Sequence, residues 1–162
     1  TRGLMGYTSR FLTLTKGTGV INRIFHGYGK FEGEMDGRKN GALISMSTGK
    51  AVAFAIFNLQ ARGEMFVTHN DPVYEGMIVG LTPKPGDMII NVMKGKQLTN
   101  MRTQGTDENV VLTPVRQMSI AEQLSMLNTD EALEITPKSL RLRKAILNPH
   151  DRKKSEKSGA AA

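Results

Sequence analysis

The stretch of the chain that most constrains the fold is MIVGLTPKPGDMIINVM, residues 77–93. It contains two apolar runs of strand length, 77–82 and 87–93, which are rich in Ile and Val. Between them stands Pro83-Lys84-Pro85-Gly86, in which proline removes a backbone donor and glycine permits a turn. The stretch therefore predicts two strands that are separated by a turn.

Similar short runs occur on both sides of this stretch. The further strand candidates are 42–46, 65–68, 109–113, 134–136 and 139–143, with a turn at 47–50. Residues 51–57 are apolar on both faces, which fits a buried strand or the start of a helix, and 58–63 is expected to form a helical turn. Several short strands with regular turn signals favour a mainly β domain, as a small barrel or a strongly curved sheet.

One helix is signalled by its start. Ser119 stands three residues before Glu122, which forms a capping box in which the serine oxygen accepts from the glutamate amide. Ile120, Leu124 and Leu127 follow at helical spacing. We therefore expect a helix over 119–127.

A second helix and a strand precede the β-rich region. Leu4, Tyr7, Phe11 and Leu14 form one helical face within residues 3–15, and 20–25 then has the composition of a strand. One helix and one strand are about half of a small α/β sandwich, so we expect the other half upstream in a longer protein. The Gly-rich, charged residues 27–40 are expected to be a linker or an ordered surface loop, and to mark the domain boundary.

The charge of the chain points to an anionic partner. The formal net charge is +7 over 162 residues, which favours nucleic acid or an anionic membrane surface. A polar loop, 94–108, lies between two strand candidates and is too long for a tight turn. Its basic half contains Lys94, Lys96 and Arg102, together with Asn100, and these side chains suit phosphate and sugar oxygens.

A second basic cluster follows the predicted helix. Its members are Lys138, Arg141, Arg143 and Lys144. Alternation along the strand 139–143 would place the two arginines on one face and the leucines between them on the other. Aromatic residues are few here, so we expect contacts with the backbone of structured RNA rather than stacking on single-stranded bases.

Catalytic patterns fail at each place where the sequence suggests one. Thr48-Gly49-Lys50 resembles a phosphate-binding loop, but Ile44 stands where that motif needs glycine and Ala51 where it needs Ser or Thr. Gly27-x-Gly29 lacks the third glycine of a dinucleotide fingerprint, because Glu32 occupies its place. We therefore expect no catalytic or cofactor site in this chain.

Metal and membrane sites are not indicated either. The chain has no Cys, and its three histidines are far apart with no ligand at helical spacing. The longest apolar run, 51–57, is far short of the roughly 20 residues that a membrane-spanning helix needs. We expect no metal, no membrane and a cytoplasmic location.

Several long segments resemble a known family. Residues 1–7 and 12–19 are similar to the end of domain V in ribosomal translocase-type GTPases, most closely those of the TypA/BipA family. Five further segments look like that family's own C-terminal domain: 40–45, 49–55, 73–80, 96–102 and 136–144.

The resemblance implies an α+β chain in three parts. Residues 1–29 would be a helix–strand remnant of a ferredoxin-like domain V. Residues 30–150 would be the mainly β, barrel-like C-terminal domain with one or two short helices, and 151–162 would be a basic, flexible tail.

The resemblance also implies a function. The parent would be a translational GTPase that binds the 70S ribosome near the A site and serves translation under stress or cold and large-subunit assembly. Its GTP and Mg would sit in a GTPase domain absent here, so this chain would not be an enzyme. In the family a loop reaches towards A-site tRNA and the peptidyl-transferase region; the matching positions are Lys94, Lys96, Asn100 and Arg102.

Two interpretations follow for this chain. The first is a monomeric, non-catalytic part that binds rRNA and tRNA through the loop and through Lys138, Arg141, Arg143 and Lys144. The alternative is a protein-interaction or scaffold module that docks ribosomal proteins or the parent's own upstream domains, with the charge only aiding approach.

Overall fold

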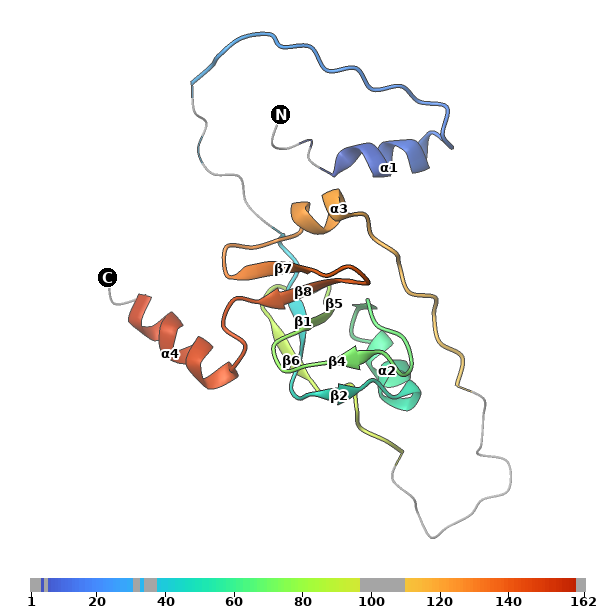
Figure 1. Ribbon diagram of the computed structural model, residues 1–162, viewed down its shortest axis with the longest axis vertical. Coiled ribbons are helices and arrows are strands. Elements are labelled where there is room, and N and C mark those ends of the chain that lie inside the picture. Colours follow the sequence, from blue (N-terminus) through green and yellow to red (C-terminus); the bar gives the residue numbers. More distant parts are fainter. Residues whose placement is uncertain (1–3, 5, 31–32, 34–37, 97–109, 160–162) are drawn as a thin grey trace.

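The structure is a computed structural model that describes residues 4, 6–30, 33, 38–96 and 110–159 (Figure 1). In chain order its elements are α1 (Tyr7–Leu14), β1 (Ala42–Ser45), β2 (Gly49–Lys50), α2 (Ala53–Gln60), β3 (Glu64–Met65), β4 (Pro72–Val73), β5 (Ile78–Leu81), β6 (Met88–Ile90), α3 (Ile120–Ser125), β7 (Glu131–Ile135), β8 (Leu140–Lys144) and α4 (Pro149–Gly159). The expected mixed α+β, mainly β architecture is confirmed.

The main sheet has the strand order β3-β5-β1-β6. β1 pairs antiparallel with β5 and parallel with β6, so the two strands of the opening stretch flank β1 and do not pair with each other. Leu43 and Val79, from β1 and β5, are fully buried. A side chain at Gly41 would collide with the carbonyl of Gly86, because the predicted Pro-Gly turn folds closely over the start of β1.

Two small sheets complete the β structure. β2 pairs with β4, and β7 pairs with β8 in a hairpin. The Lys144 amide donates to the Gly76 carbonyl at 2.9 Å and so fixes the hairpin to the main sheet. Over the described residues the three sheets stay separate and do not close into a barrel.

The helices show which alternative the apolar run 51–57 adopts. It begins α2, and the ring of His69 accepts the hydrogen bond of the Ala53 amide at 3.2 Å, which satisfies a donor in the first helical turn. The capping box is confirmed at α3, where Ser119 Oγ accepts from the Glu122 amide at 3.3 Å.

The basic segment that we expected to be a flexible tail is helical as far as Gly159. Pro149 opens α4 with a preset φ, and Asn148 Oδ1 accepts from the His150 amide at 2.8 Å as a cap. Asp151 in the first turn and Lys157 in the last suit the helix dipole.

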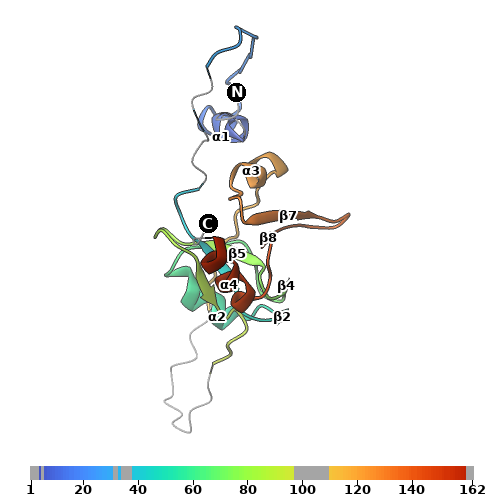
Figure 2. The same ribbon diagram turned by 90° about the vertical axis from the view of Figure 1, so that its left-hand side faces the viewer.

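Two of the strand predictions, 20–25 and 109–113, are wrong in the residues that the structure describes. Residues 20–25 have no strand partner, and a strand is stable only when its backbone groups are paired. Residues 110–113 are likewise irregular. Val20, Ile24 and Phe25 are consequently 78%, 92% and 73% exposed. Figure 2 shows α1 and the segment after it extending away from the sheets beyond α3.

Candidate nucleic-acid interface

The β7–β8 hairpin presents two of the predicted site residues. Arg141 stands opposite Glu134, and Arg143 opposite Ala132. Leu142 and Lys144, at the alternate positions, are buried, whereas both arginines are only half-buried. The predicted alternation of β8 is therefore present, and it places Arg141 and Arg143 on the more open face.

Both arginines already have protein partners. Arg141 Nη1 lies 3.4 Å from Glu134 Oε1, and Arg143 Nη1 donates to the carbonyls of Lys144 and Ala145 at 3.1 and 3.4 Å. Such bonds orient the guanidinium groups and leave further N–H donors on each of them for a ligand.

The half-buried phenol of Tyr74 lies next to this face and holds one of its carboxylates. Tyr74 donates to Glu134 Oε2 at 2.6 Å, while Arg141 holds the other oxygen of the same carboxylate. Burial and the hydrogen bond to Glu134 raise the pKa of Tyr74 to about 12. The phenol therefore stays protonated at neutral pH and fixes Glu134 under Arg141.

Lys144 is misplaced in the predicted RNA-binding set. Its side chain is 2% exposed, and its Nζ lies 2.5 Å from Asp87, 2.6 Å from Asp130 and 3.1 Å from Glu131. Three carboxylates around one ammonium leave no charge for a phosphate. Lys144 thus serves to hold the hairpin against the main sheet.

Arg38 extends this ion cluster to the segment that precedes β1. Its Nη2 lies 2.6 Å from Glu131 Oε1, and its Nη1 donates to the Met126 carbonyl at 3.2 Å. The Glu131 side chain is fully buried and needs both cations, because an unpaired buried carboxylate is costly. The cluster ties the approach to β1, the start of β6 and the hairpin together.

The pKa values of the cluster follow from these contacts. Burial would raise the pKa of Asp87, but the Ala42 amide and the Lys144 ammonium outweigh burial and hold it below its usual value. Burial would likewise lower the pKa of Lys144, but Asp130, Asp87 and Glu131 together raise it. Asp87 and Lys144 are therefore both charged at neutral pH.

The remaining predicted cations are exposed. Lys94 and Lys96 lie in the segment that follows β6, and Lys138 lies in the turn between β7 and β8. For Lys94 and Lys138 the described part of the chain offers no ion-pair partner. Asn100 and Arg102 lie outside the described residues.

The described loop residues Lys94 and Lys96 do not lie beside the hairpin. Figure 1 shows the chain after β6 leaving at the end of the molecule opposite α1, whereas the β7–β8 turn projects to one side. A polyanion that touches both must therefore span two faces.

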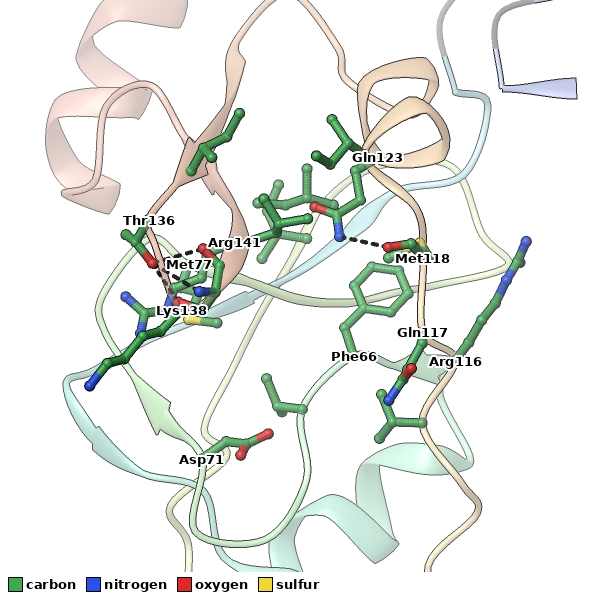
Figure 3. A pocket seen from close by; sticks show the side chains of 18 of the residues that line it. Phe66, Asp71, Met77, Arg116, Gln117, Met118, Gln123, Thr136, Lys138 and Arg141 are labelled. Atoms are coloured by element: carbon green, nitrogen blue, oxygen red, sulfur yellow. Dashed lines mark hydrogen bonds between the residues drawn. The ribbon is translucent and has the colours of Figure 1, made fainter. Parts of the chain in front are cut away.

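A groove that the sequence did not reveal lies beside the hairpin. It has a volume of about 840 Å³ and runs between the β7–β8 turn, residues 115–118 and residues 66–71. Figure 3 shows Lys138 and Arg141 on one side of it, Arg116 on the other and Phe66 between them. Arg116 pairs with Glu122 and lies 4.0 Å from Glu64.

Two other kinds of site are tested by the structure. Among the described residues no group of three or more His, Cys, Asp or Glu is arranged to hold a metal ion. No described helix is long and apolar enough to cross a membrane.

Comparison with known proteins assigns this chain to a family. The model of the TypA/BipA C-terminal domain matches residues 40–149, which run from the residues before β1 to the first residue of α4. The chain belongs to the TypA/BipA family. The resemblance inferred from the sequence is thereby confirmed.

TypA/BipA relatives match almost the whole chain. The "Large ribosomal subunit assembly factor BipA" of Buchnera aphidicola subsp. Schizaphis graminum is 48% identical over 157 residues, which is 96% of this chain and 26% of that relative. The proteins of the same name from Salmonella typhimurium (strain LT2) and Escherichia coli (strain K12) are each 46% identical, over 96% and 97% of this chain and 26% of their own length. The chain spans about a quarter of the length of these relatives.

Proposed function

We propose that this chain is the non-catalytic, RNA-binding part of a TypA/BipA translational GTPase that acts on the large ribosomal subunit. Membership of the family and the printed name of the relatives, a large-subunit assembly factor, support a ribosomal role. GTP and Mg would be bound by a GTPase domain elsewhere in the parent, which would work in the cytoplasm.

One observation carries the RNA-binding part of this proposal. The basic residues include a buried pair, Arg38 and Lys144, whose charge carboxylates neutralise, the half-buried Arg141 and Arg143, and an exposed set. In the exposed set Lys94 and Lys138 face solvent with no carboxylate partner in the described part of the chain. Exposed amines without a carboxylate partner keep their full charge for phosphate contacts.

The loop is the proposed principal contact. Lys94 and Lys96 begin it, and Asn100 and Arg102 continue it in sequence. We propose that these four residues reach tRNA in the A site of the 70S ribosome. Lys138, Arg141 and Arg143 would contact rRNA from the hairpin, and the parent would serve translation under stress or cold.

Salt dependence of binding tests the loop assignment. We compare the wild-type chain with Lys94→Ala/Lys96→Ala/Arg102→Ala. Each is titrated with tRNA and with a large-subunit rRNA transcript at roughly 50 to 200 mM salt, where the affinity due to phosphate contacts depends steeply on salt concentration. Losing three phosphate contacts flattens the log–log slope by roughly 2 to 3.

A matched triple variant serves as the control. Arg10→Ala/Lys16→Ala/Lys30→Ala removes the same formal charge from the N-terminal segment, so it corrects for the change in net charge. An equal flattening in both variants would show a general charge effect and would remove the loop from the proposal.

A second function has its own observation. Val20, Ile24, Phe25 and Tyr28 are between 73% and 99% exposed, and burying such surface is favourable. We propose that this apolar segment docks the parent's upstream domains. A parent protein in which these four side chains stay as accessible to a small labelling probe as in the isolated chain would refute the docking role.

A further inference from the structure

The groove beside the hairpin contains one buried acceptor that no residue in the described part of the chain satisfies. Gln123, from α3, is 8% exposed and lines the groove. Among the described residues its Oε1 is the only buried side-chain oxygen or nitrogen without a hydrogen-bond partner. A buried carbonyl oxygen left unpaired costs stability, so its retention calls for a use.

The orientation of this amide is fixed by its neighbour. Gln123 Nε2 donates to the Met118 carbonyl at 3.4 Å, and the flipped amide would set two oxygens against each other. Figure 3 shows the amide at one end of the groove, with its nitrogen towards Met118 and its oxygen on the side of the hairpin. Oε1 itself is covered by the side chains that line the groove, so a ligand that carries an N–H or O–H reaches this unpaired acceptor once they shift aside.

The other walls suit a flat aromatic ligand. Phe66 is half-buried, and Figure 3 shows its ring within the groove beneath Gln123 and Met118. Ile135, which is exposed, and Leu140, which is half-buried, line the groove and supply aliphatic surface. An aromatic ring and aliphatic walls provide stacking for the faces of a nucleobase, while a buried amide oxygen reads a donor on its edge.

The rim suits phosphates on both sides of such a base. Lys138 is exposed without an ion-pair partner in the described residues, and Arg141 lies beside it (Figure 3). Arg116, on the opposite side, has side-chain exposure of 46% and keeps N–H groups beyond its carboxylate partners. One acidic residue, Asp71, lies at the far end from Gln123 and accepts from the Thr68 amide at 2.7 Å.

We propose that this groove binds one unpaired nucleotide of an RNA chain, with its base against Phe66, a base N–H on Gln123 Oε1, and its flanking phosphates at Lys138 and Arg116. The inference rests on the proposed RNA-binding function and adds a nucleotide site separate from the loop. It also differs from the sequence-based expectation of contacts with the backbone of structured RNA rather than stacking on single-stranded bases.

Short RNA probes test the site on the full 162-residue chain. Each is a pentanucleotide with four abasic flanking positions, so that the central base cannot be replaced by a neighbour in another register. The central position holds adenine, unsubstituted purine, which has no N–H, or no base. Fluorescence anisotropy is expected to give about tenfold weaker binding without the base and about fivefold weaker binding for purine.

Gln123→Met separates recognition from packing. This variant keeps the volume but removes the acceptor, so it should bind adenine and purine probes equally, while its thermal midpoint stays the same or rises. Equal binding of adenine and purine by the wild type, or a variant that loses stability but still discriminates, would overturn the role of Gln123.

Phe66→Leu tests the stacking wall in the same way. The variant should lose most of the difference between the adenine and abasic probes. Equal binding of these probes by the wild type, with structured RNA still bound in a salt-dependent manner, would overturn the nucleotide site and leave the proposed function intact. Failure to bind any RNA, structured or short, would overturn both.

Discussion

Replacing Lys144 with Met tests whether the buried ion cluster or RNA contact explains this residue. The Lys144 ammonium is surrounded by Asp87, Asp130 and Glu131 at 2.5 to 3.1 Å and is 2% exposed. Met fills nearly the same volume, so the perturbation removes the charge and little packing. The three carboxylates are then left with one cation, Arg38, whose contact is with Glu131.

The structure sets the size of the effect. Removing one partner of a buried ion pair costs about 3–5 kcal/mol. The side chains of Asp87 and Asp130 are 33% and 59% exposed, so water relieves part of their repulsion. Glu131 is fully buried but retains Arg38. We therefore expect Lys144→Met to lower the free energy of unfolding by about 3 kcal/mol, at the lower end of that range.

Urea denaturation followed by circular dichroism measures this loss. Lys138→Met is the matched control, because it makes the same change at an exposed site on the same hairpin and should stay within about 0.5 kcal/mol of the wild type. RNA binding should show the opposite order. Lys138→Met should weaken it, because Lys138 faces solvent, whereas Lys144→Met should leave it unchanged, because Lys144 is buried. Two results would refute the reasoning. One is a loss below about 1 kcal/mol in the free energy of unfolding of Lys144→Met. The other is a flatter salt dependence of RNA binding by folded Lys144→Met than by the wild type.

Three further predictions concern pH and local stability. The pKa of Asp87 is lowered in the fold, so its contribution to the stability of the fold is present above the unfolded pKa of about 3.9 and is lost as pH falls through the folded pKa. The difference in thermal midpoint between wild type and Asp87→Asn should therefore shrink towards zero below about pH 4. The difference in 295 nm absorbance between wild type and Tyr74→Phe should titrate near pH 12, and a midpoint near pH 10 would show a solvated phenol. Amides of α1 should exchange with deuterium faster than those of β1 and β5, whereas equal protection would show that α1 belongs to the same cooperative unit.

The strands that the sequence predicted share a clear cause. Residues 77–93 form β5 and β6 because apolar runs of strand length are separated by Pro and Gly, and these signals are local. Residues 20–25 have the same composition but no partner among the described residues, and pairing is not a local property. The run 51–57 is ambiguous because it is apolar all round, and the ring that accepts from its Ala53 amide, His69, stands 16 residues further along.

The candidate site divides in the same way. Lys144 alternates in step with Leu140 and Leu142, which indicates an inward position, whereas its place in a basic run predicts an RNA contact. The groove could not be predicted, because its walls come from residues 66–71, 115–118 and 135–142. Only the fold brings these segments together with Gln123.

Binding to purified large ribosomal subunits tests the central claim most directly. The claim is that the chain binds RNA phosphates through exposed cations and does not dock on ribosomal protein. Sedimentation of the 162-residue chain with large subunits is measured from 50 to 500 mM salt. The account predicts co-sedimentation at low salt and release as salt rises, with release at lower salt for Lys94→Ala/Lys96→Ala/Arg102→Ala. Co-sedimentation that persists at 500 mM salt and is equal in the variant would contradict it.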